Sequence, residues 1–185
     1  MAVCGALSLD ESTDPWQPDS IAKAFLDEHP RPLFLSLGSS EQVAPQATRA
    51  LLREAAQRSG LPAILQFKSD RTGQTTREGK VLCLPRAPHS RLFPSCAGVV
   101  HHGGAGTVHT IARAGVPSMA LGFVSEQLDW GRQMAKTGAA LPPRSFWKTK
   151  PTQLADELHR LVSDESMRAS AKALGSRVAG EDGVA

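Results

Sequence analysis

The chain has 185 residues, a length that suits one domain with a sizeable buried core. Hydrophobic residues make up 41% of the sequence and charged residues 21%, as in ordinary soluble globular proteins. The formal net charge of +3 comes from 21 basic against 18 acidic residues without a basic cluster, so we expect no nucleic-acid partner.

Two further observations concern the cellular compartment. The chain has no apolar run of the length of a membrane span, and its first residues lack the charged and then apolar layout of a signal peptide. Its three cysteines, Cys4, Cys83 and Cys96, are an odd number without metal-binding spacing. We therefore predict a cytoplasmic protein with free thiols and no metal site.

The N-terminal part of the chain carries little pattern. Residues 1–20 are polar and punctuated by proline, which is typical of a linker or loop. A short amphipathic helix is predicted over residues 21–28, with Ile21, Ala24 and Phe25 on its apolar side. The prolines that follow end this helix, because proline excludes helix at its own position and just before it.

Further along the chain, short apolar runs alternate with segments of helical periodicity. Strands are predicted at 33–37, 63–67, 81–84, 98–101, 118–122 and 139–141. Helices are predicted at 43–59, 107–115, 126–136, 151–162 and 164–178, with a short helical piece in 87–94. The polar segment 68–80 is predicted to be an exposed loop. The alternation indicates an α/β fold with a parallel sheet, whose ligands bind at the carboxyl ends of the strands.

The stretch 97–110, Ala-Gly-Val-Val-His-His-Gly-Gly-Ala-Gly-Thr-Val-His-Thr, joins a buried strand to a helix through a glycine-rich turn. Gly103, Gly104 and Gly106 leave the turn nearly bare, so its unpaired N–H groups lie at the positive end of the helix dipole and can bind phosphate. His102 adds an imidazole donor whose charge can respond to an anion. The pattern predicts a pyrophosphate site, and therefore a nucleotide or nucleotide-sugar ligand.

Other readings of this turn are weaker. No Gly-Lys-Ser/Thr follows it as in a Walker loop, and His109 stands where a dinucleotide fingerprint has its third glycine. Glu126 lies about the right distance along the chain for the ribose-binding acid of that fingerprint, so a dinucleotide such as NAD stays an alternative. A purely structural glycine turn is the other alternative.

Several motifs, in this order and spacing, resemble the donor-binding half of GT-B glycosyltransferases, and most of all the family-1 UDP-glycosyltransferases of the sterol 3-beta-glucosyltransferase type. They are Leu35-Ser-Leu-Gly-Ser39, Pro88-His89, Leu92-Phe-Pro94, His102-Gly-Gly-Ala-Gly-Thr107, Gly115-Val-Pro117 and Glu126-Gln-Leu-Asp-Trp-Gly131. The resemblance covers nearly the whole chain. It implies a Rossmann-like three-layer α/β/α sandwich with a parallel sheet, one half of a GT-B fold. Residues 1–20 would be a remnant of the interdomain linker, and residues 21–185 the donor-binding domain with its C-terminal helix truncated.

Carried over position by position, the resemblance implies three groups of donor contacts. The pyrophosphate would be held by Ser39, His102, Gly103, Gly104, Ala105, Gly106 and Thr107. The nucleobase and ribose would be framed by Arg86, Ala87 and His89, and the donor sugar by Glu126 and Gln127. A carboxylate and an amide suit a sugar, whose hydroxyls both donate and accept hydrogen bonds. Two positions depart from the family: Arg86 stands where plant members stack an aromatic residue on the base, and Glu126 where aspartate is commoner.

The resemblance assigns no catalytic residue to this chain, because the catalytic His–Asp pair of the family belongs to a separate N-terminal acceptor domain. It implies the donor half of an enzyme that moves a hexose from a UDP-sugar to a lipid or sterol-like hydroxyl with inversion. No cofactor is implied besides the UDP-sugar substrate, and peripheral membrane association of the full enzyme stays open. Without the acceptor domain or a partner chain, the donor half is expected to be inactive. The alternatives are a subunit of a split N-acetylglucosaminyltransferase and a non-catalytic remnant that binds nucleotide-sugars.

Overall fold

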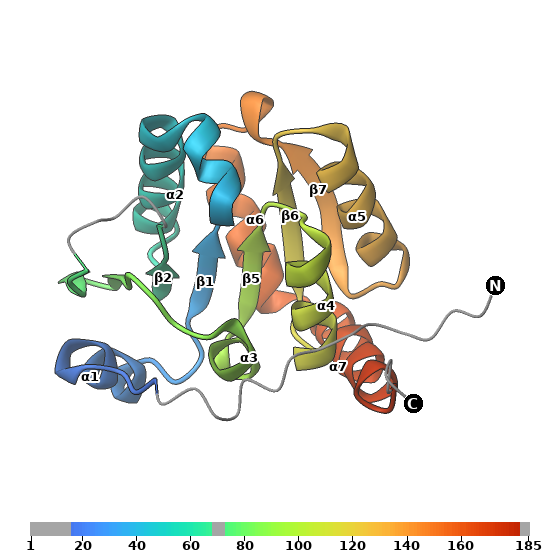
Figure 1. Ribbon diagram of the computed structural model, residues 1–185, viewed down its shortest axis with the longest axis horizontal. Helices are drawn as coiled ribbons and strands as arrows, with labels where there is room; N and C mark the ends of the chain where they lie inside the picture. The colour runs from blue at the N-terminus through green and yellow to red at the C-terminus, as the bar shows by residue number, and fades with distance from the viewer. Residues whose placement is uncertain (1–15, 68–72, 182–185) are drawn as a thin grey trace.

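Helices and strands alternate along the chain, and the structure, a computed structural model, describes residues 16–67 and 73–181 (Figure 1). The strands are β1 (Leu33–Ser36), β2 (Ala63–Leu65), β3 (Thr76–Glu78), β4 (Val81–Cys83), β5 (Gly98–His101), β6 (Ser118–Gly122) and β7 (Ala140–Ser145). The helices are α1 (Ser20–Glu28), α2 (Pro45–Ser59), α3 (His89–Leu92), α4 (Ala105–Ala114), α5 (Ser125–Lys136), α6 (Pro151–Ser163) and α7 (Glu165–Ala179). Short 3-10 turns lie at η2 (Gly38–Val43), η3 (Phe93–Ser95) and η4 (Phe146–Lys148).

Within the described residues, the strands form one seven-stranded sheet in the order β3-β4-β2-β1-β5-β6-β7. Neighbouring strands are parallel except β3, which runs antiparallel to β4. Helices α2 and α6 cover one face of the sheet, α3, α4 and α5 cover the other, and α7 packs against α4. This arrangement confirms the predicted three-layer α/β/α sandwich.

The central strands are buried on both faces, which explains their continuous apolar sequence. Every residue of β1 is buried. Its Leu33 and Leu35 pack with the residues of α2 and α6, whereas Phe34 packs with those of α3 and α4. Burying each such side chain stabilises the fold by roughly 1.5–3 kcal/mol relative to leaving it in water.

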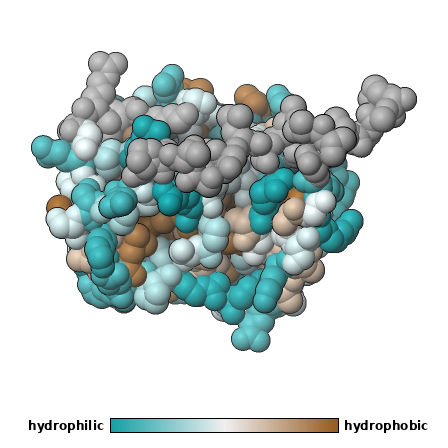
Figure 2. Space-filling view, turned by 60° about the horizontal axis from the view of Figure 1, so that its bottom comes forward, coloured by the Kyte–Doolittle hydropathy of each residue, from teal (hydrophilic) through white to brown (hydrophobic). Residues whose placement is uncertain are grey.

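The surface and the cysteines agree with an ordinary globular domain. Figure 2 shows hydrophilic and hydrophobic residues interspersed over the face at the lower end of the sheet. None of the described helices has the length and apolar character that crossing a membrane requires. Cys83 and Cys96 are buried and form no disulfide within the described part of the chain, while Cys4 lies outside it.

Two predictions for the first half of the chain were wrong in part. The segment 68–80 contains strand β3, three exposed polar residues that pair with β4 and show no apolar alternation by which to recognise a strand; residues 68–72 lie outside the described chain. Helix α1 buries Ala22 and Phe25, whereas Ile21 is 44% exposed. The prediction was right for Phe25, but the buried face of the helix includes Ala22 in place of Ile21 and Ala24. In so short a helix, few apolar positions define which face is buried.

Helix α4 and strand β7 are longer than predicted. Helix α4 begins at Ala105 and not near Thr107, because Gly104 already has the extended backbone of an N-cap, with φ −70° and ψ 140°. Strand β7 continues beyond the predicted 139–141 through two prolines to Ser145. An edge strand allows this, since one side of its backbone needs no partner strand.

Candidate functional site

The mutually parallel strands all end at one edge of the sheet, at the top of Figure 1. The chain moves from β1 outward to β2 and β4, then returns to β5 and moves the other way to β6 and β7. Strands β1 and β5 are neighbours, so the strand order reverses between them. Open α/β sheets bind their ligands outside the carboxyl ends of the strands at such a point. Turn η2 follows β1 here, and the glycine turn follows β5.

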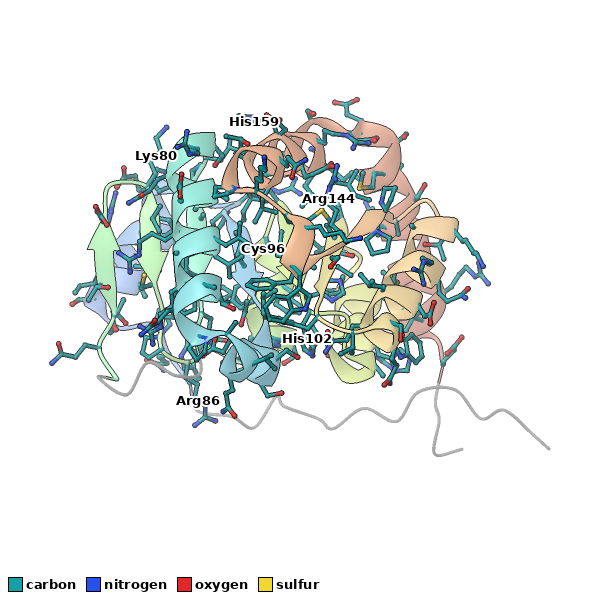
Figure 3. The ribbon with its side chains drawn as sticks, turned by 90° about the horizontal axis from the view of Figure 1, so that it is seen from above. Lys80, Arg86, Cys96, His102, Arg144 and His159 are labelled. Atoms are coloured by element: carbon teal, nitrogen blue, oxygen red, sulfur yellow. The ribbon has the colours of Figure 1, made fainter. Side chains whose placement is uncertain are left out.

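The imidazole of His102 lies between two glycines, one from each of these turns. A Cβ atom placed on Gly104 would lie 2.3 Å from His102 Nε2, and one placed on Gly38 would lie 3.0 Å from His102 Cε1. The φ of +56° at Gly38 also favours glycine. His102 is half-buried, and Figure 3 shows it at the carboxyl edge, well inside the outline of the molecule. The ring therefore lies close against the backbone of both turns, and neither glycine position leaves room for a side chain.

The turn between β5 and α4 presents backbone donors. Gly103 has φ +92°, and a Cβ atom there would lie 2.2 Å from the Gln127 carbonyl oxygen, so the turn runs directly against α5. Gly104 is the N-cap of α4, and no side chain of the described chain caps this helix. The amides from Ala105 to Thr107 therefore lie at the positive helix end without intrahelical acceptors. An anion placed here would gain both hydrogen bonds and the helix dipole.

His101 ends β5 and differs sharply from the histidine that follows it. Its side chain is buried, and its Nδ1 accepts a hydrogen bond from the Gly103 N–H at 3.1 Å. Burial, and to a lesser extent the neighbouring His102, lowers the pKa of His101 to about 3. The ring is thus neutral at physiological pH, with its proton on Nε2 because Nδ1 is the acceptor. His101 shapes the turn but carries no charge toward a ligand.

Gln127 and Glu126 lie in the first turn of α5. The Phe123 N–H donates to Gln127 Oε1 at 2.8 Å, and Gln127 Nε2 donates to Ser40 Oγ at 2.9 Å. The Gln127 side chain thereby joins the loop after β6 to turn η2 after β1, across the end of β5 between them. Glu126 and Ser39 are exposed at the same edge. The predicted pyrophosphate and sugar residues are therefore brought together.

The three residues predicted to frame the base lie after β4, which β2 and β1 separate from β5. Arg86 is exposed, and Figure 3 shows it at the rim of the molecule, away from His102. Ala87 is buried. His89 is half-buried, with its Nε2 2.9 Å from Gln66 Oε1 and its ring stacked at 4.7 Å on the phenylalanine of η3. His89 thus packs into the domain, whereas Arg86 is accessible.

Sequence reasoning placed the loop 38–40 at this edge but assigned no role to two of its residues, which touch the predicted site. Gly38 contacts the His102 ring, and Ser40 binds the Gln127 amide. The available signal was the Gly-Ser-Ser run directly after the first buried strand, where α/β sheets place ligand-binding loops. It marks the loop but not which of its residues pack against the later turns.

The family model of the erythromycin biosynthesis protein CIII-like C-terminal domain matches residues 63–182. The chain belongs to this family of glycosyltransferase C-terminal domains. The likeness to solved glycosyltransferases below confirms the GT-B half-domain that the motifs implied. The glycine turn and the start of α5 both lie inside the matched segment.

Two curated relatives of this glycosyltransferase domain are named for different sugars and acceptors. The O-mycaminosyltylonolide 6-deoxyallosyltransferase of Streptomyces fradiae is 31% identical over 169 residues, which cover 91% of this chain and 39% of the relative. The sterol 3-beta-glucosyltransferase UGT80A2 of Arabidopsis thaliana is 29% identical over 185 residues, covering 99% and 29%. The sterol type that the motifs suggested is therefore not singled out. The chain spans less than two fifths of the length of either relative.

Solved structures that resemble this chain are also glycosyltransferases. The glycosyltransferase VinC, in complex with DTDP, has a TM-score of 0.69 and 26% identity, covering 85% of this chain and 40% of its own. The Streptomyces sp. SF2575 glycosyltransferase SsfS6, complexed with thymidine diphosphate, has a TM-score of 0.62 and 29% identity, covering 81% and 37%. Both proteins carry a nucleoside diphosphate.

Proposed function

We propose that this domain binds the nucleoside-diphosphate sugar donor of a glycosyltransferase at the carboxyl edge of its sheet. The observation that carries the proposal is the His102 ring, held between Gly38 and Gly104 beside the uncapped start of α4. The pyrophosphate would accept hydrogen bonds from the backbone N–H groups of residues 104–107 and from His102, with Ser39 approaching from η2. The Gly103 N–H, which was predicted to bind the pyrophosphate as well, donates to His101 Nδ1, so Gly103 would shape the turn. A helix end and an imidazole N–H together supply hydrogen-bond donors where two phosphates would lie.

These groups would also act on the reaction. When the sugar leaves for its acceptor, negative charge grows on the departing diphosphate. Donors that are already in place stabilise this charge without further reorganisation. The α4 amides would meet that condition because the helix holds them in place, and the His102 ring would meet it because it lies close against the backbone at Gly38 and Gly104. Direct displacement by the acceptor hydroxyl would invert the anomeric carbon.

The rest of the donor would lie on both sides of this turn. The motifs favour a UDP-hexose, and the thymidine diphosphate of the solved neighbours makes TDP the competing nucleotide. Arg86, exposed at the rim, would stack on the base, with Ala87 and His89 shaping the wall behind it. Glu126 would bind sugar hydroxyls at the start of α5.

The acceptor would be a lipid or sterol-like hydroxyl, presented by an N-terminal acceptor domain or a partner chain. Support comes from the surface of the carboxyl edge. Val43, Val124 and Trp147 follow β1, β6 and β7, and they are 64%, 54% and 59% exposed. These side chains would be available at this edge for contact with another domain or with an apolar acceptor.

Calorimetric titration of the chain with UDP, UDP-glucose, UDP-N-acetylglucosamine, TDP and NAD tests the proposal. We expect binding of uridine or thymidine ligands, and a loss of roughly 10- to 100-fold in His102→Ala, the value of one or two charge-assisted hydrogen bonds. His159→Ala is the matched control, since His159 is an exposed histidine of α6 far from the site (Figure 3).

The choice of ligands distinguishes the proposal from its alternatives. A preference for UDP-N-acetylglucosamine would favour the split transferase, and binding of NAD alone would replace the proposal with the dinucleotide reading. Binding that His102→Ala leaves unchanged would contradict the assigned pyrophosphate site. A folded chain that binds none of the ligands would contradict a donor site formed by this domain alone.

A further inference from the structure

We propose that Gln127 and Ser40 form a strut that positions the pyrophosphate-binding turns, so that Gln127 acts on the bare nucleotide as well as on the sugar. The inference rests on the proposed function, because it concerns the same site. It makes Ser40 a positioning residue, and it gives Gln127 a task that is distinct from the sugar contact implied by its motif.

The hydrogen bonds of Gln127 fix its amide in one orientation. The Phe123 N–H can only donate, so the group that faces it at 2.8 Å is the Gln127 oxygen. The Gln127 nitrogen then faces the Ser40 hydroxyl at 2.9 Å and donates to it. Both ends of the amide are therefore occupied in the domain itself. One N–H and one lone pair of the amide stay available by count for a sugar hydroxyl.

Gln127 also contacts the glycine turn through its backbone. A Cβ atom on Gly103 would lie 2.2 Å from the Gln127 carbonyl oxygen, and one on Gly122 would lie 3.1 Å from Gln127 Cβ. This residue therefore touches the loops that follow β1, β5 and β6. The Gln127 side chain spans the carboxyl end of β5, and the Gln127 backbone packs against Gly103 of the glycine turn.

The bond between Gln127 and Ser40 is connected through η2 to His102, the residue that would bind the phosphates. Ser40 lies in the same 3-10 turn as Gly38, and the Ser40 N–H donates to the Leu37 carbonyl at 3.1 Å. Gly38 in turn contacts the His102 ring. Without the bond between Gln127 and Ser40, η2 loses a side-chain link to the loop after β6. Gly38, which lies in η2 beside the His102 ring, is then less firmly positioned. Looser positioning of Gly38 lowers the affinity for any pyrophosphate, with or without a sugar.

The test compares UDP with UDP-glucose, or TDP with its sugar, whichever nucleotide the wild-type chain binds. We expect Ser40→Ala to lower the affinity for the bare nucleotide by about fivefold, the scale of one internal hydrogen bond. Gln127→Ala should lower it at least as much, because it also removes the bond from the Phe123 N–H. The double variant should lose little more than Gln127→Ala alone, because both substitutions remove the bond between Gln127 and Ser40. Ser40→Thr keeps the hydroxyl and should keep the affinity. Gln133→Ala, an exposed glutamine of the same helix, is the control.

A loss confined to the sugar-bearing donor in Gln127→Ala would overturn the strut and leave Gln127 a sugar contact. Additive losses in the double variant would overturn it as well. Hydrogen exchange of the ligand-free chain gives a second readout: Gln127→Ala should speed exchange of the Phe123 amide and of the η2 amides. Unchanged exchange at these amides would contradict the strut, whether or not the chain binds a nucleotide. Failure to bind any nucleotide would count separately, against the proposed function.

Discussion

His101 and His102 are neighbours in the sequence, yet their environments give them different chemistry. His101 is buried at the end of β5 and accepts a hydrogen bond from the turn. His102 is half-buried between two glycines at the carboxyl edge. A strand turns successive side chains to opposite faces, and the chain leaves the strand between these two residues. One histidine can therefore shape the turn while the other meets the ligand.

The first prediction at the residue scale concerns the glycine beside His102. Gly104→Ala would place a methyl group 2.3 Å from Nε2 of His102, so the ring must move. We expect nucleotide affinity to fall by about tenfold or more, as for loss of a charge-assisted hydrogen bond. Titration calorimetry measures it, with a thermal melt to show that the variant folds.

Gly106→Ala is the control for stability. Gly106 lies in the first turn of α4, and a Cβ atom there would meet nothing within 4 Å. Alanine should raise the free energy of unfolding by about 0.5–1 kcal/mol, because glycine is the poorer helix former. Equal nucleotide affinity in Gly104→Ala and the wild type would contradict the contact with His102.

The second prediction concerns the pH dependence of stability. The pKa of His101 falls from its ordinary 6.5 to about 3 on folding, chiefly through burial. Between these values the unfolded chain binds a proton that the folded chain does not. The contribution to stability is thus complete above pH 6.5 and is lost as the pH falls toward 3. The slope is at most about 1.4 kcal/mol per pH unit.

Urea unfolding at about pH 7.5 and about pH 5 measures this slope. His101→Gln removes the titrating ring and should flatten the dependence on pH in that range. An unchanged slope in this variant would show that other groups cause the acid loss.

At the scale of elements, the packing of α7 on α4 depends on two glycines. A Cβ atom on Gly175 of α7 would lie 2.7 Å from Gly115 Cα, at the end of α4. Gly115 has φ +65° and caps α4 in the left-handed conformation. The backbones thus meet directly, and α7 is held close to the helix that begins at the candidate site.

Gly175→Ala is therefore expected to destabilise the domain. Overpacking of this kind costs about 1–3 kcal/mol, although alanine is the better helix former by about 1 kcal/mol. Ser176→Ala, at the exposed neighbouring position, should change the free energy of unfolding by less than about 0.5 kcal/mol. Denaturant unfolding of both variants tests the contact, and a stabilised Gly175→Ala would show that the helices separate without cost.

At the scale of the whole molecule, we predict that the purified chain binds a nucleotide-sugar but transfers little or no sugar. The chain spans 39% of its Streptomyces fradiae relative. Placing an acceptor hydroxyl beside its base supplies much of the rate in such reactions, and the resemblance puts that base in another domain. Release of UDP or TDP with a panel of sterol and lipid alcohols measures transfer. Rapid turnover by this chain alone would contradict the prediction.

The sequence by itself determined the fold class, most elements and the position of the glycine turn. Its apolar runs and helical periods are local features, and burial in a parallel sheet imposes them directly. The sequence did not reveal strand β3, because its exposed polar residues show no alternation although they pair with β4. It also indicated only part of the buried face of α1.

Only the tertiary structure decided how the loops meet. The contact of Gly38 with His102 and the bond from Gln127 to Ser40 join positions 64 and 87 residues apart, because β1, β5 and β6 are adjacent in the sheet. The order of strands sets these neighbours, and strand order follows from packing of the whole chain. No local pattern could show that the Gln127 side chain is bound within the domain. The predicted strand 98–101 did place His101 at the end of a buried strand and His102 in the turn, and the structure added the contacts of each ring.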